Sequence, residues 1–270
     1  MPKAAKAEIE TDASADPDRA IASRFLRYAD YLDYQIKNAP KRTKGARTKD
    51  ALKLGAIKVL DDVGYHAMRL SDICEVAGVS GATFYLYFEN KSDITLQVLS
   101  EYSAHFEKGI ALPPGGQRAR TPFEAMRAAN LHWLAVIRAN AGLSRCIMQL
   151  GDEEPGFREL VHRTNREWYE RIAASITRRF PTGAVSKEVA LLAAYSLGAM
   201  MDEMARKLIV YPDPALLELT GKVAPSDGEI ADFFTVLWHR ALYSSQPIEG
   251  ELGHAAREIA NLKVEAPANN

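Results

Sequence analysis

The stretch Leu70–Lys91, LSDICEVAGVSGATFYLYFENK, decides the fold class of this chain. It predicts one short helix over Leu70–Ala77 and a second helix that begins after Ser80. Gly78 between them suits the left-handed conformation that ends many helices, because it has no Cβ atom. Ser80 is a typical N-cap, since its hydroxyl can accept a free backbone N–H. Two helices that meet across a short glycine turn are typical of the DNA-binding helix-turn-helix.

The end of this stretch, Thr83–Lys91 (TFYLYFENK), resembles the T-x-Y-x-[HY]-F-x-x-K signature of TetR-family transcriptional repressors. The match continues upstream through Gly64–Tyr65, Asp72–Ile73 and Ala77–Ser80, and it covers roughly residues 47–101. The resemblance implies an all-α protein, with a three-helix DNA-binding domain followed by a larger helical domain for ligand binding and dimerisation.

The resemblance also implies a function. We expect a transcriptional regulator, and more closely a repressor, that binds a palindromic double-stranded DNA operator as a homodimer. A small-molecule effector would release it, and a largely apolar or aromatic compound, or an acyl thioester, is the effector that we expect. The alternative is a transcriptional activator or a ligand-independent DNA-binding protein of the same fold.

Major-groove readout favours short side chains near the start of the recognition helix, so that the helix approaches the base edges. Gly81 and Thr83 meet this need, although many relatives carry a larger residue in place of Gly81. The resemblance implies that the hydroxyls of Tyr85 and Tyr87 contact phosphates or bases; alternatively, one of the two is a core aromatic residue. Lys91 resembles the family's phosphate-binding lysine. The predicted DNA-binding residues are Arg47, Thr48, Arg69, Ser80, Gly81, Thr83, Tyr85, Tyr87 and Lys91.

Arg69 departs from the family pattern, because relatives often have Thr or Ser before this helix. Either Ser71 is then the N-cap of the helix over Leu70–Ala77, or this helix has no capping side chain. Upstream lies a basic segment, an expected electrostatic footprint for phosphates, with a solvated linker as the alternative. It holds Lys37, Lys41, Arg42, Lys44, Arg47, Lys49, Lys53 and Lys58 against only Asp50.

The formal net charge of −1 over 270 residues predicts nothing about nucleic acid, so only the distribution of charge is informative. Two cysteines, Cys74 and Cys146, imply neither a metal site nor a disulfide framework, and no cofactor is expected. The chain shows no nucleophile elbow, phosphate loop or HExxH motif, so we expect no enzyme. A charged N-terminus and the absence of a long apolar run favour a cytoplasmic protein without membrane segments.

Composition and helical periodicity divide the chain into five parts. An apolar stripe from Ile21 to Ile36 predicts an extra helix over residues 21–37, which either packs on the protein or forms an additional DNA or oligomer contact. The parts are a disordered tail (1–18), this helix with a basic linker (19–46), the helix-turn-helix domain (47–92), the ligand-binding and dimerisation domain (93–246) and a C-terminal tail (247–270).

Capping residues and periodicity place the remaining helices. Asn90 or Ser92 starts the next helix, and the resemblance implies that this helix joins the DNA-binding domain to the ligand domain. The predicted helices span residues 92–108, 121–139, 143–150, 157–180, 187–209, 226–243 and 252–262, with an acidic turn at 151–156 and a loop at 211–224 that holds one short turn.

The resemblance implies an effector site between residues 121 and 209. For most of these side chains the alternative is an ordinary core position. The predicted ligand-binding residues are His132, Trp133, Ile137, Cys146, Met148, Trp168, Tyr169, Tyr195 and Met200. An anionic part of the ligand would meet Arg158, Arg163, Arg166 and Arg171, unless these arginines form a solvated face with neighbouring glutamates.

The resemblance places the dimer interface on the last two main helices, and the alternative for each residue is the core of its own subunit. The predicted interface residues are Leu191, Ala194, Leu197, Gly198, Met201, Phe233, Val236, Leu237 and Arg240.

Overall fold

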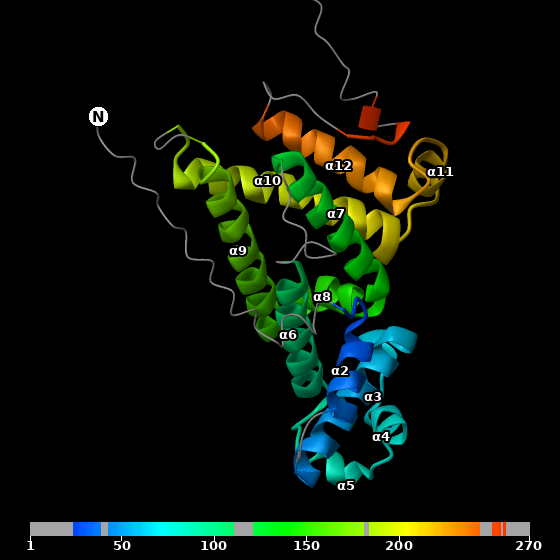
Figure 1. The fold of residues 1–270 in the computed structure, drawn as a ribbon. Coiled ribbons are helices and arrows are strands. Elements are labelled where there is room, and N and C mark those ends of the chain that lie inside the picture. Colours follow the sequence, from blue (N-terminus) through cyan, green and yellow to red (C-terminus); the bar gives the residue numbers. More distant parts are fainter. Residues whose placement is uncertain are drawn as a thin grey trace, which may run out of the picture.

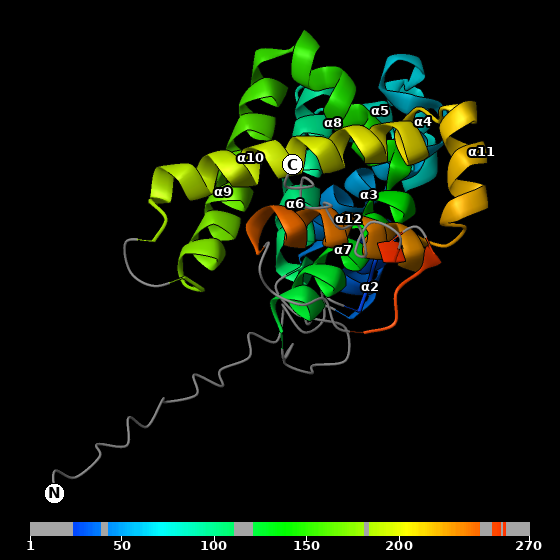
Figure 2. The ribbon, with the colours of Figure 1, turned by 90° about the horizontal axis from the view of Figure 1, so that it is seen from above.

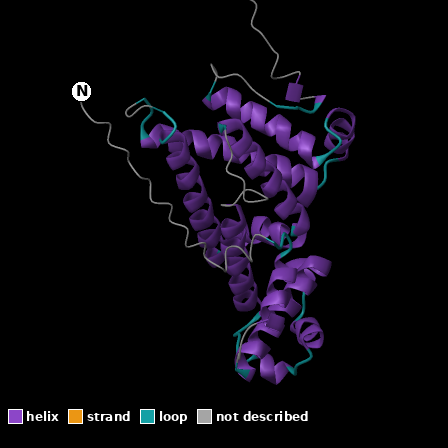
Figure 3. Cartoon of the chain, viewed as in Figure 1, coloured by secondary structure: helices purple, strands orange, loops and turns teal. Residues whose placement is uncertain are grey.

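The computed structural model describes residues 24–38, 43–110, 121–180, 184–243, 250–254 and 256–257, apart from the side chains of 107–110 and 152. Every regular element in these ranges is a helix, which confirms the all-α prediction (Figure 3). The helices are α2 (Tyr28–Asn38), α3 (Lys44–Ala67), α4 (Leu70–Ala77), α5 (Gly81–Phe84), α6 (Lys91–Ile110), α7 (Pro122–Ala139), α8 (Ala141–Glu153), α9 (Pro155–Thr177), α10 (Lys187–Ala205), the π-helix η1 (Arg206–Val210), α11 (Pro214–Val223) and α12 (Asp227–Leu242).

Helices α3, α4 and α5 form the head of the molecule (residues 44–88), at one end of the chain trace (Figure 1). The predicted turn is present: Gly78 adopts φ 67° and ψ 35°, and it ends α4 where expected. Ser80 caps α5, because its hydroxyl oxygen accepts the backbone N–H of Thr83 at 3.2 Å. The glycine conformation and the local hydrogen bond therefore determine where α4 ends and α5 begins.

The head is closely packed where α3 crosses α4. A Cβ atom on Gly55 would lie 2.9 Å from the carbonyl oxygen of Ile73, so only glycine permits this approach. The buried side of α4 runs through Leu70, Ile73 and Cys74. Val76 is 48% exposed, because it lies beside the stripe of Leu70, Ile73, Cys74 and Ala77 that faces the core of the head.

Helix α3 runs from Lys44 to Ala67 and is kinked at Gly64. It begins at Lys44, where the Thr43 hydroxyl accepts the N–H of Ala46. Gly64 breaks its helical geometry with φ 74° and ψ 173°, a positive φ that glycine adopts without a steric cost. Tyr65 follows and is buried against α9, with its ring 6.2 Å from that of Phe157.

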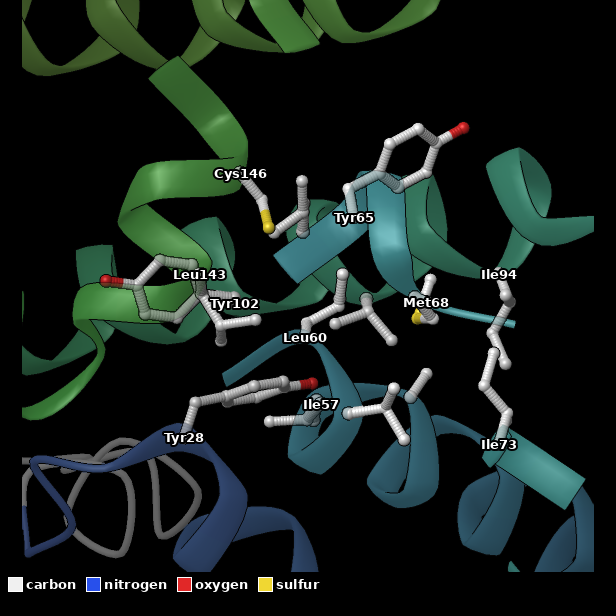
Figure 4. Close-up of a cluster of buried hydrophobic side chains, with 14 of the residues drawn as sticks. Tyr28, Ile57, Leu60, Tyr65, Met68, Ile73, Ile94, Tyr102, Leu143 and Cys146 are labelled. Atoms are coloured by element: carbon white, nitrogen blue, oxygen red, sulfur yellow. The ribbon is translucent and has the colours of Figure 1, made fainter. Parts of the chain in front are cut away.

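Helices α7 to α12 form the body (residues 122–242), and α6 leads to it from the head (Figure 1). Helices α10 and α12 lie at the end of the molecule farthest from α5 (Figure 1), and Figure 2 shows the two helices running alongside each other. One hydrophobic cluster extends from the head into α7, α8 and α9, and Figure 4 shows Leu143 and Cys146 of α8 against α3. The core therefore crosses the domain boundary predicted at residues 92–93.

Three boundaries in the body differ from prediction. Residues 151–156 are not a turn, because α8 continues to Glu153 and α9 begins at Pro155, which suits a first helical position. The helix predicted to reach residue 209 changes to a π-helix at Arg206. Residues 214–223 form α11 rather than a loop, since Asp213 caps it through the N–H groups of Ala215 and Leu216.

The extra N-terminal helix is shorter than predicted. Residues 24–27 form a non-helical turn, and α2 begins at Tyr28. It packs along α3 of the same chain, which agrees with the packing interpretation. The predicted tail 1–18, residues 19–23 and most of the predicted helix 252–262 lie outside the described residues.

Candidate nucleic-acid interface and internal cavity

Helix α5 presents an open surface at the tip of the head. Gly81 and Ala82 are exposed, Tyr85 is 62% exposed and Leu86 is 78% exposed. The hydroxyls of Ser80 and Thr83 lie 2.9 Å apart, so each orients the other at the start of the helix. This surface combines small residues at the N-terminus with protruding polar groups, as approach to a major groove requires.

The aromatic residues after α5 divide between surface and core. Phe84 and Phe88 are buried, whereas Tyr85 projects outward. Tyr87 is half-buried against the head core, and its hydroxyl would be 3.3 Å from a Cβ atom on Gly45 at the start of α3. Tyr85 is therefore the more accessible of the two predicted tyrosine contacts.

Lys91 is engaged within the protein. Its ammonium donates to the carbonyl oxygen of Tyr65 at 3.0 Å and lies 4.4 Å from the centre of that ring. A phosphate contact by Lys91 stays a prediction, and it would compete with this internal hydrogen bond. Arg47 is exposed on α3, whereas the Thr48 hydroxyl donates to the carbonyl oxygen of Lys44 at 3.0 Å.

The start of α4 shows how a helix begins without a capping hydroxyl. Arg69 occupies the N-cap position, and its backbone N–H donates to the carboxylate of Asp72 at 3.1 Å. The prediction that Ser71 takes over the cap is wrong, because its hydroxyl donates to Asp72 instead. The Arg69 side chain is left exposed on the surface of the head.

The body and α6 line a partly open cavity of about 530 Å³. Its walls come from α6 to α10 and from α12, and most of its lining is aliphatic or aromatic. Five of the predicted ligand-binding residues line it, namely Trp133, Ile137, Met148, Trp168 and Tyr169. The cavity is large enough for a small organic molecule.

The other four predicted ligand-binding residues lie elsewhere. Cys146 is fully buried in the core between α8 and α3, where burial raises the pKa of its thiol to about 11. Tyr195 is on the outer side of α10, with its ring 4.4 Å from that of Tyr169. His132 and Met200 do not line the cavity, because neighbouring positions on their helices, such as Trp133 and Met201, face it.

Helix α6 supplies cavity residues that the sequence reading missed. Tyr102, Ser103 and Phe106 line one wall of the cavity. The apolar stripe of the predicted helix 92–108 was the available signal, but periodicity does not distinguish a cavity wall from solid core. Tyr102 is buried, and this burial raises the pKa of its hydroxyl to about 12.

Polar groups occur at defined points of the cavity. The Tyr169 hydroxyl donates to Asp202 at 2.9 Å; burial raises the pKa of the Asp202 carboxyl, and this hydrogen bond opposes the rise. Of the four arginines considered for an anionic ligand, only Arg158 lines the cavity. Arg163, Arg166 and Arg171 lie on the exposed side of α9.

The outer faces of α10 and α12 differ from the predicted interface. Ala194, Gly198 and Met201 are buried within their own subunit, and a Cβ atom on Gly198 would overlap the ring of Tyr169. Val236 is buried against Phe123. The apolar residues of α10 that face outward are Val189 (56% exposed), Leu192 (68%) and Tyr195 (39%).

Helices α4 and α5 meet at a glycine turn, and α5 is exposed to solvent. Helix α6 joins them to a helical body that contains a cavity. These features define a helix-turn-helix DNA-binding protein. Residues 54–98 match the family model for bacterial regulatory proteins of the tetR family. Residues 54–98 thus carry the helix-turn-helix domain of a TetR-family transcriptional regulator. No helix among the described residues is long and apolar enough to cross a lipid bilayer.

Three known proteins illustrate the similarity. The fatty acid metabolism regulator protein of Bacillus subtilis (strain 168) is 39% identical over 66 residues, which are 24% of this chain and 32% of that protein. The HTH-type transcriptional regulator EthR of Mycolicibacterium smegmatis is 22% identical over 77% of this chain and 91% of that protein. The crystal structure of a TetR-family regulator from Mesorhizobium loti shares the fold, with a TM-score of 0.57 and 19% identity over 74% of this chain and 98% of that one.

Proposed function

We propose that this protein is a cytoplasmic repressor that binds a palindromic operator as a homodimer and is released by an apolar effector. The observation that carries the proposal is the position of α6, which starts at Lys91 against Tyr65 of the head and forms a cavity wall through Tyr102, Ser103 and Phe106. A ligand in the cavity therefore touches the helix that holds the DNA-binding surface. Effector binding acts on DNA binding to the extent that the ligand prefers one position of α6.

An acyl chain, carried as an acid or a thioester, is the effector class that we favour. The cavity lining is mostly apolar, which suits a flexible hydrocarbon. The volume of about 530 Å³ lies within the usual range of pockets for small organic ligands. Arg158 supplies a cation for an anionic group of such a ligand. The name of the Bacillus subtilis relative, a fatty acid metabolism regulator, points to the same class of compound.

The DNA-binding part of the proposal is tested by fluorescence anisotropy on the intergenic DNA beside the protein's own gene, at several salt concentrations. Binding should weaken steeply as salt rises, because phosphate contacts release counterions. Tyr85→Phe should weaken binding about tenfold, given roughly 1.5 kcal/mol for a hydrogen bond to a charged group. Tyr211→Phe is the matched control, since Tyr211 is also exposed (39%) but lies in the body. If the Tyr85→Phe and wild-type proteins bind the DNA with equal affinity, the Tyr85 hydroxyl makes no contact with the DNA.

The effector part is tested by adding dodecanoyl-coenzyme A and free dodecanoic acid to the same complex. Release of the DNA by either compound supports the acyl class. Met148→Trp adds volume to the cavity wall and should abolish the response while operator affinity in the absence of ligand stays as in the wild type. A Met148→Trp protein that still responds to the compound would place its binding site outside the cavity.

A further inference from the structure

The segment of residues 24–38, here called the strap, joins three parts of the molecule. It consists of the turn at 24–27 and helix α2, and it precedes the helices that match the family. Its first residues sit where α3, α6 and the α7–α8 junction meet. Figure 4 shows Tyr28 reaching from the strap toward Ile57 of α3, with Tyr102 of α6 and Leu143 of α8 nearby.

The backbone of the strap is held by a buried side chain of the body. Asn140, at the junction of α7 and α8, is 1% exposed. Its amide oxygen accepts the N–H of Tyr28 at 2.8 Å, and its amide nitrogen donates to the carbonyl oxygen of Leu26 at 2.7 Å. Arg27 also pairs with Asp61 of α3 at 2.9 Å. Because buried polar groups are costly to leave unpaired, these contacts define one position of the strap.

Tyr28 connects the strap to both α3 and α6. It is 3% exposed, and its ring centre lies 5.9 Å from that of Tyr102. Its hydroxyl donates to Glu101 of α6 at 3.1 Å, and the same carboxylate accepts from Lys53 of α3 at 2.6 Å. One tyrosine thus packs against α6 and completes a charged hydrogen-bond network between α6 and α3.

Both anchors of the strap adjoin the cavity. Tyr102, which packs against Tyr28, lines the cavity. Its hydroxyl lies 3.4 Å from the hydroxyl of Ser144, another lining residue. Asn140 follows the lining residue Ile137 by one helical turn. A ligand that displaces Tyr102 or the α7–α8 junction therefore acts directly on groups that hold the strap.

We propose that the strap couples the cavity to the head, with Tyr28 and Asn140 as positioning residues that hold α6 and α8 in register with α3. This proposal rests on the proposed function, in which an effector in the cavity controls DNA binding. Movement of α6 against α3 must break the Tyr28 and Asn140 contacts, so the strap stabilises the present arrangement. Loosening it changes operator and effector affinity in opposite directions, because under the proposed function the two ligands prefer different positions of α6, and a shift between these positions favours one ligand at the expense of the other.

The first test needs neither operator nor effector. Spin labels are placed at Leu86→Cys in the head and Glu170→Cys on α9, both exposed positions, and the labelled chain is diluted with unlabelled protein so that intrachain distances are measured. Removal of residues 1–38 should shift or broaden the distance distribution. Removal of residues 1–23, which keeps the strap, is the control and should leave the distribution unchanged.

A point variant covers the case in which the truncated protein does not fold. Tyr28→Ala should reproduce the altered distance distribution, whereas Tyr34→Ala, whose ring packs on Phe25 within the strap, should not. An unchanged distribution in a folded Tyr28→Ala protein would overturn the proposal and reduce the strap to a stabilising element, even if its melting temperature fell.

The second test measures affinity for the operator and for dodecanoyl-coenzyme A. In the strap variant the two dissociation constants should change in opposite directions by about fivefold or more, as expected for an allosteric coupling. A merely structural role would leave both constants unchanged or weaken both. If the wild-type protein binds no DNA, the proposed function fails, but the label distances still decide whether the strap positions the head.

Discussion

At the scale of single residues, Gly142 shows how closely the body packs on the head. A Cβ atom at this position of α8 would lie 2.5 Å from the Oδ1 atom of Asp61 and 2.7 Å from its Cα atom. The Cα atom belongs to the backbone of α3 and cannot rotate away. Glycine is therefore required where α8 crosses α3, next to the Arg27–Asp61 ion pair.

Gly142→Ala should lower the free energy of unfolding by about 1–3 kcal/mol, the usual cost of an overpacked contact. Gly221→Ala is the control, because no heavy atom lies within 4 Å of its Cβ position in α11. This control should gain roughly 0.5–1 kcal/mol from reduced chain entropy. Urea denaturation measures both values, and equal stabilities for the two variants would contradict the close approach.

At the scale of elements, α5 depends on its cap more than any longer helix does. It has only four residues, so propagation contributes little and the end groups dominate. The Ser80 hydroxyl binds both the N–H and the hydroxyl of Thr83. The geometry of the exposed DNA-binding surface thus rests on one side chain.

Ser80→Ala should cost about 1 kcal/mol of stability and should also weaken operator binding. Ser186→Ala removes an equivalent cap at the start of α10, where the hydroxyl accepts the N–H of Val189 at 3.2 Å. The two variants should lose similar stability in thermal melts, but only Ser80→Ala should bind operator less tightly in anisotropy titrations. An equal loss of affinity in both would show that general stability, rather than the cap geometry, controls binding.

At the scale of the whole molecule, the outward face of α10 is the surface that we expect to dimerise. Val189, Leu192 and Tyr195 repeat at spacings of three and project away from their own subunit. Leu192→Glu should convert the dimer to a monomer, because a charge buried at an interface without a partner is costly. Leu219→Glu on α11, where leucine is 54% exposed, is the control. Sedimentation velocity distinguishes the outcomes, and a dimeric Leu192→Glu protein would place the interface elsewhere.

The sequence alone determined the elements whose causes are local. Helix α4, the Gly78 turn and the Ser80 cap lie where predicted, and α7 has the predicted bounds because Thr121 and Glu124 form a reciprocal cap. Capping and left-handed glycines act over a few residues, so neighbouring side chains are sufficient to predict them. The same holds for the signature residues after Ser80, whose types carried the family resemblance.

Only the tertiary structure decided what each helix face contacts. Cys146 lies in solid core and Tyr195 on the surface, although both had been expected at a ligand site. Asn140 binds the backbone of Tyr28 from 112 residues away, a contact that periodicity does not reveal. The rotation of a helix about its axis depends on all the elements packed against it. The cavity, the outward face of α10 and the strap are therefore properties of the assembled fold.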